Sequence, residues 1–329
     1  MGSNQPPEMG IIGLGRMGGN LALQAVEKGI RVVGFTKGGV PAELREAGVV
    51  AIDSLAGFTQ ALPRPRKIFL YIPSGPAVDQ LIDALLPALE VGDVIVDAGN
   101  SYWGDSLHRH QRLQKTGIHF VDCGTSGGID GARHGACFMV GGEEEPVALI
   151  EPILRQLAVE GGYVHAGPAT AGHFTKLVHN GIEFGMLQAI GEGVDLLEHH
   201  RDKLDVANVL RCWRHGSVVR SWLMDLMDAA YRQEGGLGRV PAYVDDTGEV
   251  NWLVADALRM EVGIPVIAEA VMQLLASRDS DKSWARAIAM MRHGFGGHAY
   301  GPSESARAER LLGRVEDFSP ETPRVGVQP

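Results

Sequence analysis

Short apolar runs alternate with longer amphipathic stretches over the first half of the chain. The apolar runs, which predict buried strands, lie at residues 9–13, 30–35, 67–72, 93–97, 119–123 and 136–140. Between them, apolar residues recur with helical spacing and predict helices at residues 20–28, 77–89 and 144–157. Because strands that are apolar throughout are buried on both sides, this alternation predicts a parallel sheet with helices on both faces.

The pattern changes near residues 165–172. A helical pattern without proline runs from His173 to about His200, and helices separated by turns follow to about Gly313. We therefore predict an α/β fold, with a Rossmann-like, doubly wound parallel sheet followed by an all-helical C-terminal domain. The expected parts are a flexible leader, a dinucleotide-binding Rossmann domain, a helical domain for substrate binding and oligomerisation, and a loose tail, at residues 1–8, 9–170, 171–313 and 314–329.

Charge and cysteine content exclude several classes of protein. The 329 residues carry 30 Lys and Arg against 40 Asp and Glu, a net charge of −10, which argues against a nucleic-acid partner. No apolar run approaches the about 18 residues of a membrane span, and the start of the chain lacks a secretory signal. Three cysteines without metal-like spacing fit reduced thiols. We expect a cytoplasmic protein with neither a membrane nor a nucleic-acid partner.

A glycine-rich motif follows the first predicted strand. Its G-x-G-x-x-G pattern suits a dinucleotide pyrophosphate, because it joins a strand to a helix whose N-terminus offers free N–H groups. In this interpretation Gly13 permits the turn, Gly15 lets the backbone approach the phosphates, and Gly18 lets helix and strand pack closely. The alternative is a turn without a ligand. The candidate cofactor residues of this loop are Gly13, Gly15, Arg16, Met17 and Gly18.

The end of the second predicted strand bears on the choice of cofactor. An NAD-specific domain usually carries a carboxylate there for the ribose 2′-hydroxyl, whereas this chain reads Gly34-Phe35-Thr36-Lys37. A hydroxyl and a cation suit a 2′-phosphate, so NADP is the preferred cofactor and NAD the alternative. Lys37 could also be an ordinary solvated surface lysine.

Two further motifs follow strands, at the edge where parallel sheets bind ligands. In Asp97-Ala-Gly-Asn100-Ser101, the Asn100 amide can both donate and accept, which suits a group between cofactor and substrate. In Gly124-Thr-Ser126-Gly127-Gly128, small residues expose N–H groups and one hydroxyl, which suits a carboxylate. On these residues alone, an Asx turn and a plain loop are equally good interpretations.

Four polar residues share one face of the long helix that follows the domain boundary. Lys176, His179, Asn180 and Glu183 stand at helical spacings of three, four and seven residues. A lysine desolvated in a cleft can have a lowered pKa and act as a base. The alternative is a solvated face with a Lys–Glu pair.

Taken together, these motifs resemble the 6-phosphogluconate dehydrogenases, within the β-hydroxyacid dehydrogenase superfamily. The family's Asp-Gly-Gly-Asn-Ser, Ser-Gly-Gly and Gly-His-Phe-x-Lys-x-x-His-Asn-Gly-Ile-Glu segments correspond to residues 97–101, 126–128 and 172–183. Residues 292–298, Arg-His-Gly-Phe-Gly-Gly-His, resemble its C-terminal Arg-x-x-Phe-Gly-x-His segment. The resemblance covers about residues 9–300 and is to the short, bacterial-type form, which oligomerises.

The resemblance implies oxidative decarboxylation of 6-phosphogluconate to ribulose 5-phosphate, a reaction of the pentose phosphate pathway and gluconate utilisation. It makes Lys176 the base and then the acid, and Glu183 the acid that ends the reaction. It also implies that the lysine serves as electrophile, so that no metal is needed. The residues that would orient the substrate or hold its carboxylate are Asn100, Ser126, Gly127, Gly128, His179 and Asn180.

Two positions depart from the family pattern near the expected phosphate. Phe184 stands where the family usually has tyrosine, and Asn251 where short forms usually have arginine. The remaining candidate anion ligands are Arg220, Arg278, Arg292 and His298. The resemblance implies that Arg292 and His298 complete a neighbouring subunit's site in a homodimer or homotetramer. The alternatives are a dehydrogenase for another 3-hydroxy acid and a non-catalytic NADP-binding protein.

Overall fold

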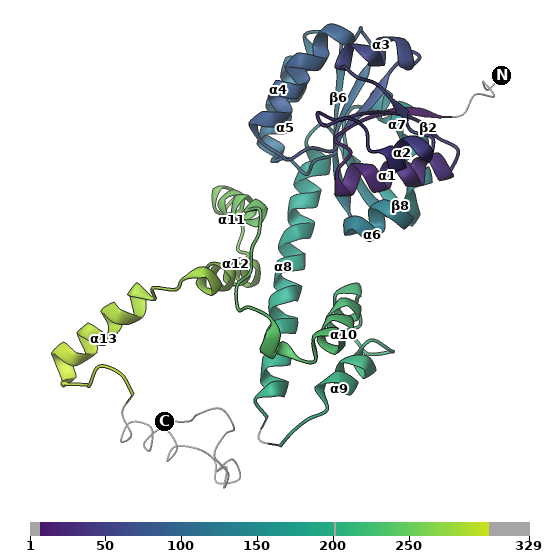
Figure 1. Cartoon of the computed structure of the whole chain (residues 1–329). Helices are drawn as coiled ribbons and strands as arrows, with labels where there is room; N and C mark the ends of the chain where they lie inside the picture. The colour runs from purple at the N-terminus through teal and green to yellow at the C-terminus, as the bar shows by residue number, and fades with distance from the viewer. Residues whose placement is uncertain (1–6, 201, 303–329) are drawn as a thin grey trace. The chain divides into compact units, whose positions relative to one another are not determined.

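The computed structural model describes residues 7–200 and 202–302 (Figure 1). The predicted tail, 314–329, and residues 1–6 of the predicted leader lie outside the described residues. The chain divides into two compact units within helix α8 (Ala171–Glu198), between Gly181 and Ile182.

The first unit is built on an eight-stranded sheet with the order β3-β2-β1-β4-β5-β6-β7-β8. The strands are β1 (Glu8–Ile12), β2 (Arg31–Phe35), β3 (Val50–Ala51), β4 (Lys67–Leu70), β5 (Val94–Asp97), β6 (His119–Ser126), β7 (Ala136–Gly141) and β8 (Ala158–Gly167). All neighbours pair parallel except β6 and β7, which are antiparallel. The predicted doubly wound sheet is therefore confirmed, with one antiparallel pair added.

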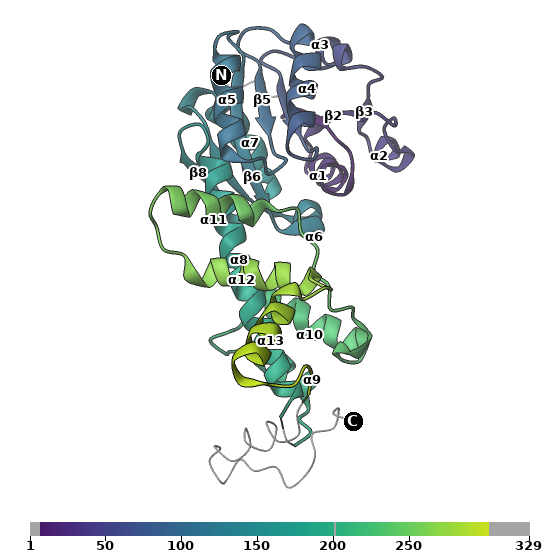
Figure 2. The same ribbon diagram turned by 90° about the vertical axis from the view of Figure 1, so that its left-hand side faces the viewer.

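Helices cover both faces of this sheet (Figures 1 and 2). They are α1 (Arg16–Glu27), α2 (Ala42–Glu46), α3 (Phe58–Ala61), α4 (Pro76–Leu85), α5 (Trp103–Gln114), α6 (Gly128–His134) and α7 (Glu144–Leu157), with short 3-10 turns η1 (Leu55–Gly57) and η2 (Leu86–Ala88). Val94 and Val96 of β5 face the core under α1 and α7, whereas Ile95 faces the core under α3, α4 and α5. This two-sided burial explains why the strands are apolar throughout.

Two strands are not visible in the sequence pattern. The strand β3 has only two residues, both exposed, and β8 forms the edge of the sheet with mostly exposed or half-buried residues. The antiparallel pairing has a local cause, because only the seven-residue helix α6 connects β6 to β7. A parallel neighbour needs a crossover of a dozen or more residues.

In its described residues, Ile182 to Pro302 without residue 201, the second unit contains helices joined by turns and no strand, as predicted. After the remainder of α8 come α9 (Val206–Trp213), α10 (Trp222–Glu234), the 3-10 turn η3 (Leu237–Arg239), α11 (Glu249–Arg259), α12 (Pro265–Arg278) and α13 (Ser283–Gly296). Leu210 of α9 and Met224 of α10 share a small core with Val194 of α8. Helices α11 and α12 lie side by side (Figure 2). Among the described residues, no helix is long and apolar enough to span a membrane.

Candidate active site

The glycine motif forms a cradle at the start of α1. Gly13 has φ +94°, and a Cβ added there would overlap the carbonyl oxygen of Tyr71. A Cβ at Gly18 would overlap the carbonyl oxygen of Gly13, so both glycines are required by chain packing. Gly15, in contrast, has open space where its Cβ would be. It directly precedes the helix, whose first N–H groups lack intrahelical partners, and such a cradle fits a dinucleotide pyrophosphate.

The segment that follows β2 presents the two residues expected to select the cofactor. The amide of Gly39 donates to the carbonyl oxygen of Thr36 at 3.0 Å and closes a turn. Within this turn Thr36 is half-buried and Lys37 is exposed. A hydroxyl and an exposed cation remain suitable for a phosphate, and NADP preference stays a prediction.

Asn100 lies in the left-handed region, with φ +55°, at the loop after β5. Its Oδ1 accepts from the amide of Thr125 at 3.0 Å, and its Nδ2 donates to the carbonyl oxygen of Thr125 at 3.3 Å. The side chain thus ties the ends of β5 and β6 together. A second N–H and a second lone pair remain on the amide, so it can still bridge two ligands.

A buried ion-pair network supports this loop. Asp97, which is fully buried, accepts from Ser101 Oγ at 2.8 Å and from the guanidinium of Arg109 at 3.2 Å. Arg109, on α5, also donates to the Asp79 carboxylate at 2.8 Å, and this pairing lowers the pKa of Asp79. Burying a guanidinium requires such partners. The sequence pattern alone does not reveal the role of Arg109, because nothing nearby in the sequence pairs it with Asp97.

The predicted catalytic face of α8 meets the Ser-Gly-Gly loop. Lys176, only 6% exposed, donates from Nζ to Asn180 Oδ1 at 2.5 Å, and its Nζ lies 3.3 Å from His179 Nδ1. On the other side of the ring, His179 Nε2 lies 3.0 Å from Ser126 Oγ. The structure therefore brings together four predicted residues from two motifs. The solvated alternative for Lys176 is wrong, because its side chain is buried.

The imidazole of His179 is suited to a lysine that changes its protonation state. An ammonium group on Lys176 can donate to Nδ1, while the N–H at Nε2 donates to Ser126 Oγ. When Lys176 is neutral, the other tautomer can donate from Nδ1 to Asn180 Oδ1, 3.1 Å away, and accept from Ser126 at Nε2. The His179 ring can therefore hydrogen-bond to its neighbours both when Lys176 is charged and when it is neutral.

Glycine makes the close contact between α8 and the sheet possible. A Cβ at Gly124 of β6 would overlap Cβ of Lys176. The sequence pattern places Gly124 in a ligand loop, whereas in the structure this glycine belongs to β6 and lies against the Lys176 side chain. Gly127 and Gly128, with φ +114° and +59°, then turn the chain into α6 and leave backbone N–H groups available for a carboxylate.

The other predicted ligands belong to the second unit. Glu183 lies two helical turns beyond Lys176 on α8 and is half-buried. Arg278 pairs with Asp246 at 2.6 Å, which raises the pKa of the guanidinium. Arg292 on α13 and His298 just beyond it are exposed, and Arg220, between α9 and α10, donates to the carbonyl oxygen of Ser217. Their roles stay predictions.

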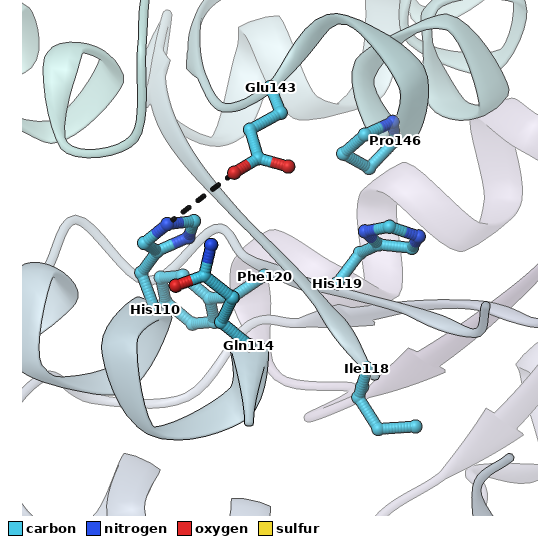
Figure 3. Close-up of a pocket in the computed structure, with 7 residues that line it drawn as sticks. All are labelled: His110, Gln114, Ile118, His119, Phe120, Glu143 and Pro146. Atoms are coloured by element: carbon cyan, nitrogen blue, oxygen red, sulfur yellow. Dashed lines mark ion pairs between the residues drawn. The ribbon is translucent and has the colours of Figure 1, made fainter. Parts of the chain in front are cut away.

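The first unit also contains a small pocket at the start of β6 (Figure 3). It is lined by His110, Gln114, Ile118, His119, Phe120, Glu143 and Pro146. His110 Nε2 lies 3.8 Å from the Glu143 carboxylate, and the pocket sits at the start of β6, whereas Ser126 ends that strand. In residues 7–200 and 202–302, no three His, Cys, Asp or Glu side chains are placed to hold a metal ion.

Sequence comparisons match both parts of the chain. Residues 8–167 match the NAD binding domain of 6-phosphogluconate dehydrogenase, and residues 172–308 match its C-terminal domain. The chain is 42% identical to the Bacillus subtilis protein named "Putative 6-phosphogluconate dehydrogenase YqeC", over 89% of this chain and 98% of that protein. It is 37% identical to an NAD(+)-dependent, decarboxylating 6-phosphogluconate dehydrogenase of Haloferax volcanii, over 88% of this chain and 97% of that protein.

Longer relatives and solved structures agree with these matches. An NADP(+)-dependent, decarboxylating 6-phosphogluconate dehydrogenase of Bacillus subtilis is 36% identical over 80% of this chain and 60% of that protein. The structure of the Plasmodium falciparum 6-phosphogluconate dehydrogenase superposes with a TM-score of 0.75 at 26% identity, covering 90% of this chain and 67% of that one. A 3-hydroxyisobutyrate dehydrogenase of Mycobacterium tuberculosis shares the fold, with a TM-score of 0.62 at 20% identity, 84% of this chain and 94% of that one.

Proposed function

The chain belongs to the 6-phosphogluconate dehydrogenase family, a family of NAD(P)-dependent decarboxylating oxidoreductases, and on that premise we propose that it converts 6-phosphogluconate to ribulose 5-phosphate and CO₂. The observation that carries this proposal is the buried Lys176, held between Asn180 and His179, with His179 in turn bonded to Ser126. A buried lysine that an amide and an imidazole hold in one position suits proton transfer, because general acid–base catalysis first requires a correctly placed nitrogen.

Lys176 acts first as a base. Its neutral Nζ takes the proton of the substrate's C3 hydroxyl, while the nicotinamide, when bound, accepts the hydride from C3. Asn180 Oδ1 accepts from Nζ at 2.5 Å and so directs the nitrogen. Ser126, Gly127 and Gly128 hold the C1 carboxylate, as the resemblance implies.

The same lysine then acts as an acid. The C1–C2 bond of the 3-keto acid breaks, CO₂ leaves, and the electron pair forms a C2–C3 double bond while Lys176 returns its proton to the C3 oxygen. Glu183 next protonates the former C2, and Lys176 removes the enol proton, which gives the ketone. The two tautomers of His179 match the two states of the lysine during these steps.

We further propose NADP as the preferred cofactor, on the strength of Thr36 and Lys37 and the lack of a carboxylate after Phe35. The pyrophosphate would bind at Gly13, Gly15 and the first turn of α1, at Arg16, Met17 and Gly18. The relatives include both an NAD(+)-dependent and an NADP(+)-dependent enzyme, so residues 36 and 37 are the discriminating feature.

A second candidate function rests on the departures at Phe184 and Asn251. Both remove polar groups where the family pattern provides them near the phosphate, and they favour a 3-hydroxy acid without that phosphate. The candidate anion ligands Arg220, Arg292 and His298 support the phosphorylated substrate instead.

The experiment is a substrate screen with purified protein. Reduced nicotinamide is followed with NADP and with NAD, for 6-phosphogluconate, gluconate and short unphosphorylated 3-hydroxy acids. The proposal predicts the highest kcat/KM with 6-phosphogluconate and NADP. Higher kcat/KM with an unphosphorylated acid would support the second candidate, and no turnover with any acid would contradict both.

A further inference from the structure

The first turn of α8 is capped by a carboxylate from another element. Asp122, in the middle of β6, accepts from the amide of Thr170 at Oδ1 (2.6 Å) and from the amide of His173 at Oδ2 (2.8 Å). The first N–H groups of a helix lack intrahelical partners, and the positive end of the helix dipole favours an anion. Asp122 is fully buried, and this burial raises the pKa of its carboxyl group. The charged form of the Asp122 carboxyl group is therefore stabilised by the hydrogen bonds from these two amides.

Two glycines allow β6, β7 and the start of α8 to pack closely around the Asp122 carboxylate. Gly141 of β7 is the partner of Asp122 in the sheet, and a Cβ there would lie 2.7 Å from Asp122 Oδ1 and 2.5 Å from the nitrogen of Gly172. A Cβ at Gly172 would lie 2.5 Å from the carbonyl oxygen of Asp122. Thr170, a β-branched residue, has φ +85°, in a region of backbone conformation that favours glycine and is strained for other residues.

A third contact ties the same turn to α5. The ring of His173, 1% exposed, places Nδ1 2.7 Å from Ser106 Oγ. The first turn of α8 is thus fixed from β6, β7 and α5. Lys176 follows His173 by three residues, which is nearly one helical turn. The position of the first turn of α8 therefore determines the position of Lys176 Nζ.

We propose that Asp122 is a positioning residue for Lys176. By holding the Thr170 and His173 amides, it sets the register of α8 over Gly124 and so places Lys176 and His179 against the end of β6, where Ser126 lies. The proposal rests on the proposed function, in which Lys176 is the base. A misplacement of about 1 Å can cost about 100-fold in rate, so loss of the cap lowers kcat even when the fold survives.

Asp93 offers a matched control in the same sheet. It is also fully buried and also accepts from a backbone amide, that of Arg66 at 2.7 Å, and from the Arg66 guanidinium. It precedes β5, at the opposite end of the sheet from the loop that carries Asn100. The variant Asp93→Asn removes a comparable buried charge without touching α8.

The test compares Asp122→Asn, Asp122→Ser and Asp93→Asn with the wild-type chain. The measurements are kcat, the dissociation constant of the cofactor, and deuterium uptake of peptides from residues 168–180. For both Asp122 variants we expect kcat to fall about 10- to 100-fold, cofactor affinity to stay within about twofold, and the α8 peptides to exchange faster. For Asp93→Asn we expect wild-type kcat and wild-type exchange in α8.

The outcomes separate this proposal from the proposed function. Wild-type kcat in a folded Asp122 variant would overturn it, as would an equal loss of kcat in Asp93→Asn or unchanged exchange of the α8 peptides. If the wild-type chain oxidises no acid, the proposed function falls, and the labelling rate of Lys176 by an amine reagent replaces kcat. That rate should then rise in the Asp122 variants, and an unchanged rate would overturn the positioning role.

Discussion

At the scale of the residue, the site depends on a buried lysine that contacts an amide and an imidazole. Lys176 Nζ donates to Asn180 Oδ1 at 2.5 Å, one turn further along α8. His179, which also contacts Nζ, is hydrogen-bonded to Ser126 on its other ring nitrogen. A surface lysine would be hydrated and would gain little from such partners. The arrangement holds one nitrogen in one place, and general acid–base catalysis requires this geometry before any matching of pKa values.

The variant Lys176→Ala tests this role. We expect kcat to fall about 10²- to 10⁴-fold, the usual contribution of a general base, with cofactor affinity unchanged. Steady-state kinetics and a cofactor titration provide the two values. Lys115→Ala, an exposed lysine at the end of α5, is the control and should keep wild-type kcat. Near wild-type turnover in Lys176→Ala would remove Lys176 from the mechanism.

The variant Lys37→Ala tests the cofactor preference. A hydrogen bond to a charged group contributes about 1.5–3 kcal/mol, so we expect KM for NADP to rise about 10- to 150-fold while KM for NAD changes little. Arg45→Ala, which removes an exposed cation from α2, should leave both constants unchanged. A wild-type chain that uses NAD as efficiently as NADP would contradict the preference.

At the scale of the element, much of the fold was predictable from local pattern. Strands β1, β4 and β5 are apolar on both faces, and the shared face of α8 follows from helical spacing alone. Edge strand β8 was not predictable, because its mostly exposed residues carry no apolar run. Arg109 was missed for a related reason: its pairing with Asp97 depends on the placing of α5 against β5, which is a tertiary contact.

Replacing glycine by alanine should change the free energy of unfolding in opposite directions at Gly124 of β6 and at Gly191 of α8. A Cβ at Gly124 overlaps Cβ of Lys176, so Gly124→Ala should lower the free energy of unfolding by about 1–3 kcal/mol and lower kcat. Gly191 has open space at its Cβ in the helix interior, so Gly191→Ala should raise the free energy of unfolding by about 0.5–1 kcal/mol. Denaturant titrations give both values. Equal effects at the two positions would contradict the close contact between β6 and α8.

At the scale of the whole molecule, the two units differ in the extent to which their large apolar side chains are exposed. The first unit buries most of its large apolar residues in two cores, one on each face of the sheet. The second unit leaves large apolar side chains exposed on α11, α12 and α13, among them Leu258 (77%), Val266 (72%) and Phe295 (75%). A second copy of the chain in the predicted homo-oligomer would bury such side chains, and we expect part of its interface here.

Subunit mixing tests whether the C-terminal segment acts across that interface. Lys176→Ala and Arg292→Ala chains are each expected to be inactive. After subunit exchange, mixed dimers should regain one complete site of two, because one chain supplies Lys176 and the other Arg292. Exchange is verified by mass-resolved labelling. Verified exchange without recovered activity would contradict action in trans, and full activity of Arg292→Ala would remove Arg292 from the site.

In the proposed mechanism, one buried lysine takes part in both the oxidation and the loss of CO₂. The most direct measurement uses 6-phosphogluconate labelled at C1 and counts labelled CO₂ and reduced nicotinamide in the same reaction. We predict one CO₂ per reduced nicotinamide in the wild-type chain, with both falling together in Lys176→Ala. Reduced nicotinamide without matching CO₂, or equal rates in the variant, would contradict the account.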